Sequence, residues 1–260
     1  MLAHFVRGMW RYRHLLASLA RREVISRYQQ SLLGPAWAIL QPLVLMLTFA
    51  LIQSFVPIPS EGVAYPVYVY AGLLPWTTFT STVTVAAPSI VQNGAIIKKV
   101  YFPREILPIS SAIVALFDLF MGGVVLALLM AGYGVVPSVW IATLPLLILV
   151  LFAFSLGIGL LAAALGTFKR DVIFVAFFLM QIWMYASPVM YPLSAVPAKW
   201  RSLYLCNPMA GIVDSFRRVL VGLGPPDWRL LGISAAGAAV TLLVGFVVFK
   251  KLEGYYADVV

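Results

Sequence analysis

The sequence predicts an all-α integral membrane protein. Of its 260 residues, 62% are hydrophobic and only 10% are charged, whereas a soluble domain has roughly 25% charged residues. So few charges cannot cover a folded body of this size with polar surface, which excludes a water-soluble enzyme. The apolar residues also form six charge-poor runs, each near the roughly 20 residues that a helix needs to cross a bilayer. These runs are 36–56, 66–87, 106–131, 139–165, 172–191 and 230–249.

The six runs are expected to be helices. Backbone groups find no water in hydrocarbon, so only helices and closed barrels satisfy them there, and the alternating pattern of a barrel strand is absent. Asp118 is the only charged residue within the runs. A carboxylate at this depth is a functional candidate, although a structural role as partner of a helix end or a basic side chain explains it equally well.

The basic residues between the runs predict the orientation. They lie in the N-terminal segment, in the second and fourth connections and at the C-terminus, whereas the first and third connections have none. By the positive-inside rule both termini are cytoplasmic. The fifth connection, 192–229, carries Lys199, Arg201, Arg217, Arg218 and Arg229 on the predicted outer side, but long loops follow the rule poorly.

The first 30 residues predict an amphipathic helix. Phe5, Met9, Tyr12, Leu16 and Leu19 share one face at helical spacing, and Arg7, Arg11, Ser18 and Arg22 lie opposite, with Arg27 following. Such a helix can lie in the cytoplasmic interface with its apolar face in lipid and its arginines toward anionic headgroups. The alternative is a basic tail that only fixes the orientation.

The chain after the fifth run is predicted to break and return. Pro188 and Pro192 interrupt the helix, because proline lacks a backbone donor and restricts its predecessor. Asn207 is a suitable N-cap, Pro208 fits the first helical position, and Gly222 provides a stop. The resulting helix is too short and, with Asp214, Arg217 and Arg218, too charged to cross the membrane. We expect it to re-enter from outside or to lie flat.

The second connection, 88–104, has the composition of a docking surface. The apolar residues Ile96, Ile97, Val100, Tyr101 and Phe102 are interleaved with Lys98, Lys99, Arg104 and Glu105. Exposed apolar groups rimmed by charge are typical of protein interfaces. The alternative is an interfacial stretch whose basic residues only anchor the chain.

Several kinds of chemistry are excluded. No G-x-x-x-x-G-K-S/T phosphate loop is present, so the chain is not its own ATPase, and no H-E-x-x-H zinc motif accompanies the two histidines. A single cysteine, Cys206, excludes an internal disulfide and a cysteine-based zinc site. An intramembrane aspartyl protease needs a second carboxylate beside Asp118. The net charge of +9 falls in clusters between apolar runs, which indicates topology rather than nucleic-acid binding.

Several short motifs occur in an order that resembles one family. They are Arg22-Glu23-Val24-Ile25 with Arg27-Tyr28, Leu33-Gly34-Pro35-Ala36-Trp37 with Gln41-Pro42, the segment from Lys98 to Glu105, Lys169-Arg170-Asp171, and Asn207-Pro208. Together they resemble the membrane subunits of ABC transporters that export polysaccharides such as O-antigen, teichoic acid or capsule. The resemblance extends over essentially the whole chain.

The resemblance implies a multi-pass permease subunit in the bacterial cytoplasmic (inner) membrane. It implies a homodimer bound to two copies of a separate ATPase subunit, which holds ATP and Mg, so that this chain has no cofactor. The substrate would be a lipid-linked polysaccharide. The N-terminal helix would be the interface helix. The second connection of this chain would contain a coupling helix that contacts the ATPase. Its residues would be Ile96, Ile97, Lys98, Lys99, Phe102, Arg104 and Glu105.

The resemblance also implies an outer gate formed by re-entrant helices in 188–221, with Pro188, Asn207, Pro208, Asp214, Arg217 and Arg218. One transmembrane domain, 1–260, would then consist of five parts. These are a cytoplasmic interface helix (1–35), spans one to five (36–191), an extracytoplasmic re-entrant segment (192–229), span six (230–249) and a cytoplasmic tail (250–260).

Aromatic residues near the ends of the runs are candidates for a glycan channel, because their faces stack weakly on sugar C–H surfaces. The candidates are Tyr65, Tyr68, Tyr70, Trp76, Trp183, Tyr185 and Tyr191. Trp and Tyr also concentrate at membrane interfaces in general, which is a sufficient alternative.

Two other functions stay open. An ABC exporter of drugs or lipids would share this architecture, because function resides in the cavity rather than in the fold. A proton-coupled secondary transporter would need several intramembrane ionisable groups and inverted repeats. Asp118 alone is weak support for that function. A membrane-embedded enzyme acting on glycans lacks a catalytic pair.

Overall fold

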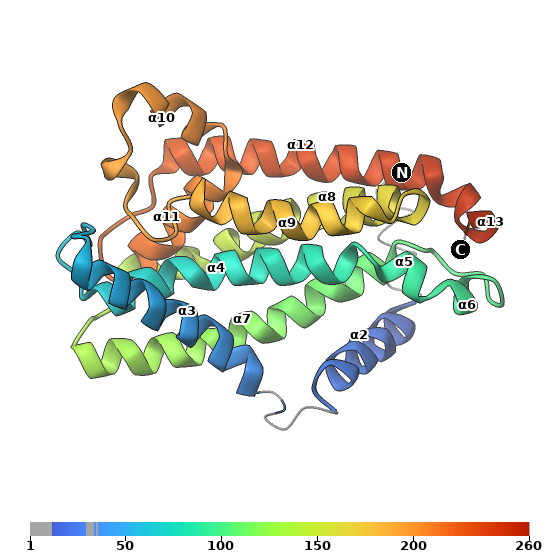
Figure 1. The fold of residues 1–260 in the computed structure, drawn as a ribbon, viewed down its shortest axis with the longest axis horizontal. Coiled ribbons are helices and arrows are strands. Elements are labelled where there is room, and N and C mark those ends of the chain that lie inside the picture. The colour runs from blue at the N-terminus through green and yellow to red at the C-terminus, as the bar shows by residue number, and fades with distance from the viewer. Residues whose placement is uncertain (1–11, 30–33, 35, 260) are drawn as a thin grey trace.

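The computed structural model describes residues 12–29, 34 and 36–259. Within these ranges the protein consists of helices and loops and contains no strand. The long helices run side by side along the longest axis of the molecule and form one bundle (Figure 1). The prediction of an all-α fold is therefore confirmed for the described part of the chain.

Four helical stretches are long and apolar enough to cross a membrane. The first two are α3 (Ala36–Phe55) and α7 (Ile106–Tyr133). The third joins η1 (Val139–Thr143) to α8 (Leu144–Phe168), and the fourth joins α12 (Trp228–Leu252) to η3 (Glu253–Tyr255). Each begins and ends within a few residues of a predicted run, so the chain is a multi-pass membrane protein.

Helix α4 (Tyr65–Ala86) occupies the centre of the bundle. It packs against α3, α7, α8 and α11 (Pro208–Leu220). Most of its residues are buried, whereas α3 buries only Pro42, Met46 and Phe49. Because protein rather than lipid surrounds α4, its hydroxyl side chains can be satisfied inside the bundle, and it needs less apolar character than a helix that faces lipid.

Helix α9 (Asp171–Tyr185) is shorter than expected. Its 15 residues are fewer than the roughly 20 of a full crossing, and it ends before Pro188. The predicted fifth run, 172–191, therefore extends beyond the end of the helix, whereas the predicted interruption at Pro188 is confirmed. The backbone turns at residues 186–191, where the missing proline donor and the restricted residue before it disfavour a further helical turn.

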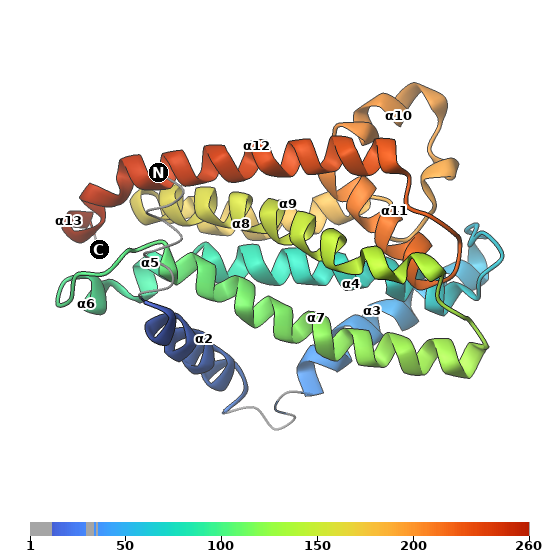
Figure 2. The ribbon, with the colours of Figure 1, turned by 180° about the vertical axis from the view of Figure 1, so that it is seen from behind.

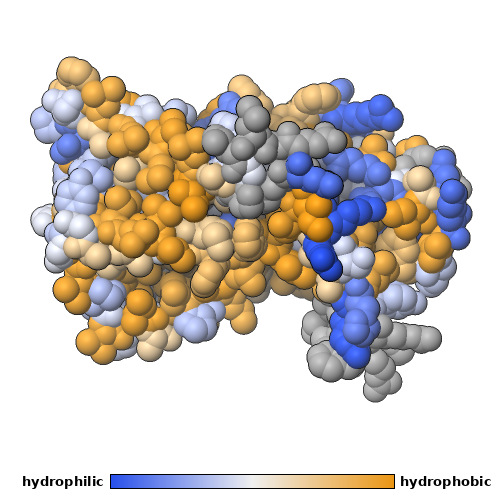
Figure 3. All heavy atoms as spheres, turned by 90° about the horizontal axis from the view of Figure 1, so that it is seen from below, coloured by the Kyte–Doolittle hydropathy of each residue, from blue (hydrophilic) through white to orange (hydrophobic). Residues whose placement is uncertain are grey.

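The bundle has two different ends. The short helices α5 (Ser89–Gln92), α6 (Gly94–Ile97) and α13 (Tyr256–Val259) gather at one end, and α10 (Ala198–Leu205) and α11 gather at the other (Figures 1 and 2). We call these the α13 end and the α10 end. On the face shown in Figure 3, apolar side chains cover much of the surface away from the α13 end, while the most hydrophilic side chains concentrate toward that end.

The N-terminal helix, α2 (Arg13–Tyr28), packs on α7 near the α13 end. Leu19 is buried and Leu16 is half-buried against the second of two hydrophobic clusters, while Ser18 and Arg22 are exposed. The predicted apolar face is present, but part of it contacts protein instead of lipid. Arg22 donates a hydrogen bond to Asn93. Arg7 and Arg11 lie outside the described residues, as does the side chain of Arg27.

The backbones of α8 and α12 lie in direct contact. A Cβ atom added at Gly157 would lie 2.6 Å from the backbone nitrogen of Leu242 and 2.7 Å from the carbonyl carbon of Thr241. One at Gly245 would meet the backbone of Gly157. The two backbones therefore touch with no side chain between them, an arrangement that small residues permit in membrane helices.

This contact predicts that adding a methyl group lowers stability at Gly157 but not at Gly232. Gly157→Ala should lower the thermal stability of the purified protein, because forcing atoms into a packed site costs about 1–3 kcal/mol. Gly232→Ala, on an exposed part of α12 with no atom near the new Cβ, should be neutral or slightly stabilising. Thermal unfolding in detergent compares the two variants, and equal melting temperatures would contradict the backbone contact.

Candidate functional site

The predicted docking segment forms a protruding tip at the α13 end, made of α5, α6 and the following loop (Figure 1). Its two most exposed large apolar side chains are Tyr101, 89% exposed, and Val100, 59% exposed. Lys98 and Lys99 are exposed beside them. The combination of apolar and basic groups on one surface agrees with the pattern in the sequence.

Other predicted contact residues of the tip point inward. Ile97 and Phe102 are 6% and 3% exposed and belong to the second hydrophobic cluster, and Ile96 packs partly against it. The expectation that Ile97 and Phe102 form an exposed surface is therefore wrong. A short connection has no core of its own, so some of its apolar residues must fix it to the bundle.

Charged residues also attach the tip to the C-terminal helix. The ammonium group of Lys250 lies 2.8 Å from a carboxylate oxygen of Glu105 and 2.8 Å from one of Glu253. The backbone N–H of Arg104 donates to Glu253 Oε1 at 3.1 Å, and its guanidinium donates to the backbone carbonyl of Glu253. Glu105 is only 5% exposed, so it joins the tip to α12 and does not lie on a free surface.

Tyr256 supports this attachment from α13. Its hydroxyl donates to the carbonyl of Phe249 at 3.2 Å, and its ring packs edge-on against the ring of Phe249. Burial, more than the nearby Glu253 carboxylate, raises the pKa of Tyr256 above its usual value. The hydroxyl therefore stays protonated and continues to donate.

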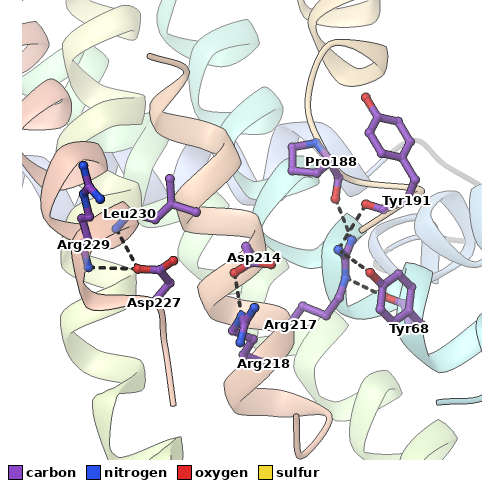
Figure 4. Close-up of polar contacts among 9 residues, drawn as sticks. All are labelled: Tyr68, Pro188, Tyr191, Asp214, Arg217, Arg218, Asp227, Arg229 and Leu230. Atoms are coloured by element: carbon purple, nitrogen blue, oxygen red, sulfur yellow. Dashed lines mark hydrogen bonds and ion pairs between the residues drawn. The ribbon is translucent and has the colours of Figure 1, made fainter. Parts of the chain in front are cut away.

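At the α10 end, Arg217 fixes the break after α9 (Figure 4). Its side chain, on α11, is 1% exposed. The guanidinium donates to the carbonyls of Pro188 at 2.8 Å and Val189 at 2.6 Å, and to that of Tyr191 at 3.4 Å. It also donates to the carbonyl of Tyr68 at 3.3 Å and to the Tyr68 hydroxyl at 3.0 Å. All five N–H donors of an arginine are thus used.

The ring of Tyr68 also stabilises this buried charge. The guanidinium carbon lies 4.1 Å from the ring centroid, which is a cation–π geometry. A Cβ at Gly72, one turn along α4, would lie 2.7 Å from the carbonyl oxygen of Val189, so only glycine admits the segment here. The predicted gate residue Arg217 is therefore a structural clamp among α4, α11 and 188–191.

The other predicted gate residues lie around this clamp. Asn207 caps α11 by accepting the N–H of Met209 at 3.1 Å, and its amide donates to Ser187 Oγ at 2.9 Å and to the carbonyl of Ala186 at 3.2 Å. Pro208 starts α11 as predicted. Asp214 forms an ion pair with Arg218 at 2.7 Å (Figure 4). Residues of α11 are buried on nearly all sides, which is more than the single apolar stripe predicted.

Most aromatic channel candidates are not accessible. Tyr65, Tyr68, Tyr70 and Trp76 are at most 5% exposed and belong to the main hydrophobic cluster. The expectation that they line an open path within this subunit is therefore wrong, with the exception that Trp76 borders the cavity described below. Position near a span end does not distinguish a channel wall from a packed helix.

The three remaining candidates lie nearer the surface. Trp183 is half-buried and donates its indole N–H to Asn207 Oδ1 at 3.1 Å. Tyr185 is exposed. Tyr191 is half-buried, donates to the carbonyl of Tyr185 at 2.7 Å and lies 2.6 Å from the Tyr204 hydroxyl.

Asp118 borders a cavity of about 520 Å³ between α3, α4 and α7. It accepts a hydrogen bond from Ser81 Oγ at 3.0 Å. The sequence reasoning missed most of the other polar residues of the cavity: Trp37, Gln41, Thr77, Thr80, Ser81 and Thr84. A signal for them exists, because hydroxyl residues in 77–84 recur at the three-to-four-residue spacing of one helix face inside an otherwise apolar run.

Metal binding has no candidate in the described residues, where no group of three or more His, Cys, Asp or Glu side chains is close enough to hold an ion.

Comparison with known proteins places this geometry in a family. Residues 14–221 match the ABC-2 type transporter family. The chain belongs to the ABC-2 type transporter family. It is 30% identical to the O-antigen export system permease protein RfbA of Myxococcus xanthus, over 99% of both chains. It is 28% identical to the protein of the same name from Klebsiella pneumoniae, over 94% of both chains.

A further relative of this ABC-2 type transporter is the polysialic acid transport protein KpsM of Escherichia coli. The two are 26% identical, over 91% of this chain and 92% of KpsM. Each of these three matches extends over at least 91% of this chain.

The clamp predicts that Arg217 and Arg218 differ sharply in their contribution to stability. Arg217→Met should destabilise the protein by at least about 3 kcal/mol, because each buried carbonyl left without a donor costs about 1–3 kcal/mol. Arg217→Lys should rescue little, since an ammonium cannot reach five acceptors in different directions. Arg218→Met removes a single ion pair, whose guanidinium side is 36% exposed, and should cost clearly less than Arg217→Met, although it leaves the buried Asp214 carboxylate without this partner. Thermal unfolding of the three variants in detergent measures this order, and similar losses at both positions would contradict it.

Proposed function

We propose that this chain is the permease subunit of an ATP-driven exporter that moves a lipid-linked polysaccharide, of the O-antigen type, across the bacterial cytoplasmic (inner) membrane. The observation that carries the proposal is the match over 99% of both chains to an O-antigen export permease. The printed names of the other relatives also refer to export or transport of a surface polysaccharide.

The proposal includes six spans in a single transmembrane domain, 1–260. The four apolar stretches supply four of them. Helix α4, long enough but less apolar, would be the second, and α9, completed by the buried break at 186–191, would be the fifth. Both termini would be cytoplasmic, with the α13 end inside, which agrees with the concentration of hydrophilic side chains there (Figure 3). Helices α10 and α11 would then form the outer gate.

The proposal also includes a homodimer. Helices α3 and α9 lie on the side of the bundle that faces the viewer in Figure 1, and both expose apolar stripes. The side chains of these stripes are at least half exposed. They include Leu47, Leu51 and Phe55 on α3 and Phe174, Phe178 and Ile182 on α9. Such faces suit a second copy of this chain across a translocation path.

Two copies of a separate ATPase subunit, which bind ATP and Mg, would complete the transporter, because this sequence has no phosphate loop. The ATPase would dock on the tip, where Val100 and Tyr101 are exposed between basic residues. Closure of the ATPase would push the tip. The ion pairs of Glu105 and Glu253 with Lys250 would pass that movement to α12 and toward the outer gate.

Reconstitution tests the function directly. The permease, co-purified with its ATPase subunit, should hydrolyse ATP faster when lipid-linked glycan from the same cell is added, and cells lacking the permease should lose surface polymer. Failure of any ATPase to associate would overturn the proposal. If cells lacking the permease lost drug resistance but kept their surface polymer, the result would favour an exporter of drugs or lipids instead.

Charge substitutions in the tip should separate docking from folding. Tyr101→Asp should leave the purified permease as stable as wild type, because the side chain is 89% exposed, but weaken ATPase association by about tenfold or more, as expected for an exposed aromatic anchor of an interface. Ile97→Asp should instead reduce the yield of folded protein, since it buries a charge in a hydrophobic cluster.

Tyr133→Asp is the matched control, because this tyrosine, at the end of α7, is also exposed but lies toward the α10 end. Co-purification of ATPase with each variant gives the comparison. If Tyr101→Asp retained the ATPase as well as Tyr133→Asp does, the tip would not be its docking site.

A further inference from the structure

The cavity beside Asp118 is polar although it lies between three helices of an apolar bundle. It has a volume of about 520 Å³, within the range of about 300–1,000 Å³ that is usual for small-molecule sites. Helix α3 contributes Trp37 and Gln41, α4 contributes Trp76 and a row of hydroxyl residues, and α7 contributes Asp118. Polar residues at such depth are costly unless they are satisfied or used.

The hydroxyl residues present mainly hydrogen-bond acceptors. Thr77 Oγ1 donates to the carbonyl of Leu73 at 2.9 Å, and Thr84 Oγ1 donates to that of Thr80 at 2.8 Å. Ser81 donates to Asp118. Each hydroxyl has a single proton, so these three oxygens can only accept a further hydrogen bond. The Asp118 carboxylate, when ionised, also only accepts.

One further hydroxyl of the cavity wall has unused capacity. Thr80 Oγ1 is buried and has no hydrogen-bond partner among the residues that the structure describes. Buried polar atoms are normally paired. The Thr80 hydroxyl is therefore available to both donate to and accept from a bound molecule.

These groups favour one kind of ligand and disfavour another. A phosphate or other anion would lie beside the Asp118 carboxylate and would be disfavoured by its negative charge. A ligand with many hydroxyl donors would pair with them. The Gln41 amide and the indole N–H groups of Trp37 and Trp76 can supply donors to the acceptor oxygens of the same ligand.

The two tryptophans also provide apolar surface. Trp76 is 3% exposed and forms part of the wall, and Trp37 is 48% exposed at the start of α3. Indole faces suit the C–H surfaces of a sugar ring, while the polar residues between them suit its hydroxyls. Trp37 and Gln41 are also two of the residues on which the family resemblance rests, and the docking and gate assignments leave them without a role.

We infer that this cavity is a binding subsite for an uncharged, hydroxyl-rich sugar unit, in which Asp118 accepts hydrogen bonds from the sugar hydroxyls and Trp37 and Trp76 contact the ring. The inference rests on the proposed function, because it assigns to the glycan substrate a place within each subunit. It differs from the aromatic path expected from the sequence, since six of its thirteen lining residues carry hydroxyl, amide or carboxylate groups.

Cysteine protection tests occupancy without altering Asp118. Cys206 is exposed and is the single cysteine of the chain, so Cys206→Ala gives a cysteine-free protein in which Thr84→Cys reports on the cavity. In the complete permease–ATPase complex, oligosaccharide released from the cell's own polymer should slow maleimide labelling of this cysteine at least threefold. Labelling of Cys206 in the otherwise native protein is the control and should not change.

Affinity supplies the second measurement. Asp118→Asn should weaken oligosaccharide binding about tenfold or more, because hydrogen bonds to a charged group are worth about 1.5–3 kcal/mol. Glu61→Gln, at an exposed carboxylate in a loop outside the cavity, should leave binding unchanged. Isothermal calorimetry with the same oligosaccharide compares both variants with the native complex.

The outcomes separate this inference from the proposed function. If the native complex exports polymer but the oligosaccharide neither protects Thr84→Cys nor binds less well to Asp118→Asn, the subsite is wrong and the function stands. If sodium or potassium chloride, or inorganic phosphate, protects the cysteine and the oligosaccharide does not, the cavity is an ion site and the inference is wrong. If the native complex neither binds nor exports glycan, both fail.

Discussion

The break after α9 takes the hydrogen bonds to three of its carbonyls from a single side chain. Where a helix stops inside a bundle, its last carbonyls lose their partners, and no water replaces them in an apolar interior. Arg217 supplies donors to the carbonyls of Pro188, Val189 and Tyr191, and its charge rests on the ring of Tyr68. An irregular backbone can therefore persist beside α4. This segment leads into α10 and α11 and so determines where they lie.

The arrangement of helices could largely be predicted from the sequence. Helix boundaries follow from apolar length and from cap residues, so Asn207 and Gly222 mark the ends of α11 correctly. The error at α9 has the same origin, because an apolar run was extended through Pro188. The central position of α4 could not be predicted, since the relative burial of helices depends on packing partners that hydropathy does not reveal.

The functional residues were less predictable than the helices. Composition identified the tip but not which of its apolar residues face outward, because Ile97 and Tyr101 differ only in the direction that the folded loop gives them. The aromatic residues of α4 proved to be core, while hydroxyl residues of the same helix border the cavity with Asp118. Threonine is common in membrane helices, where it bonds to its own backbone, so its presence alone did not indicate a cavity.

The backbone contact between Gly157 and Gly245 has a mechanical consequence. Helices that meet through long side chains can change their spacing or register by small rotamer adjustments, but here no rotamer lies between the two main chains. A shift of one helix along the other would bring Cβ atoms of neighbouring residues into collision. Helices α8 and α12 therefore behave as one stiff beam that extends between the two ends of the bundle, and changes of shape are left to the helices packed around it.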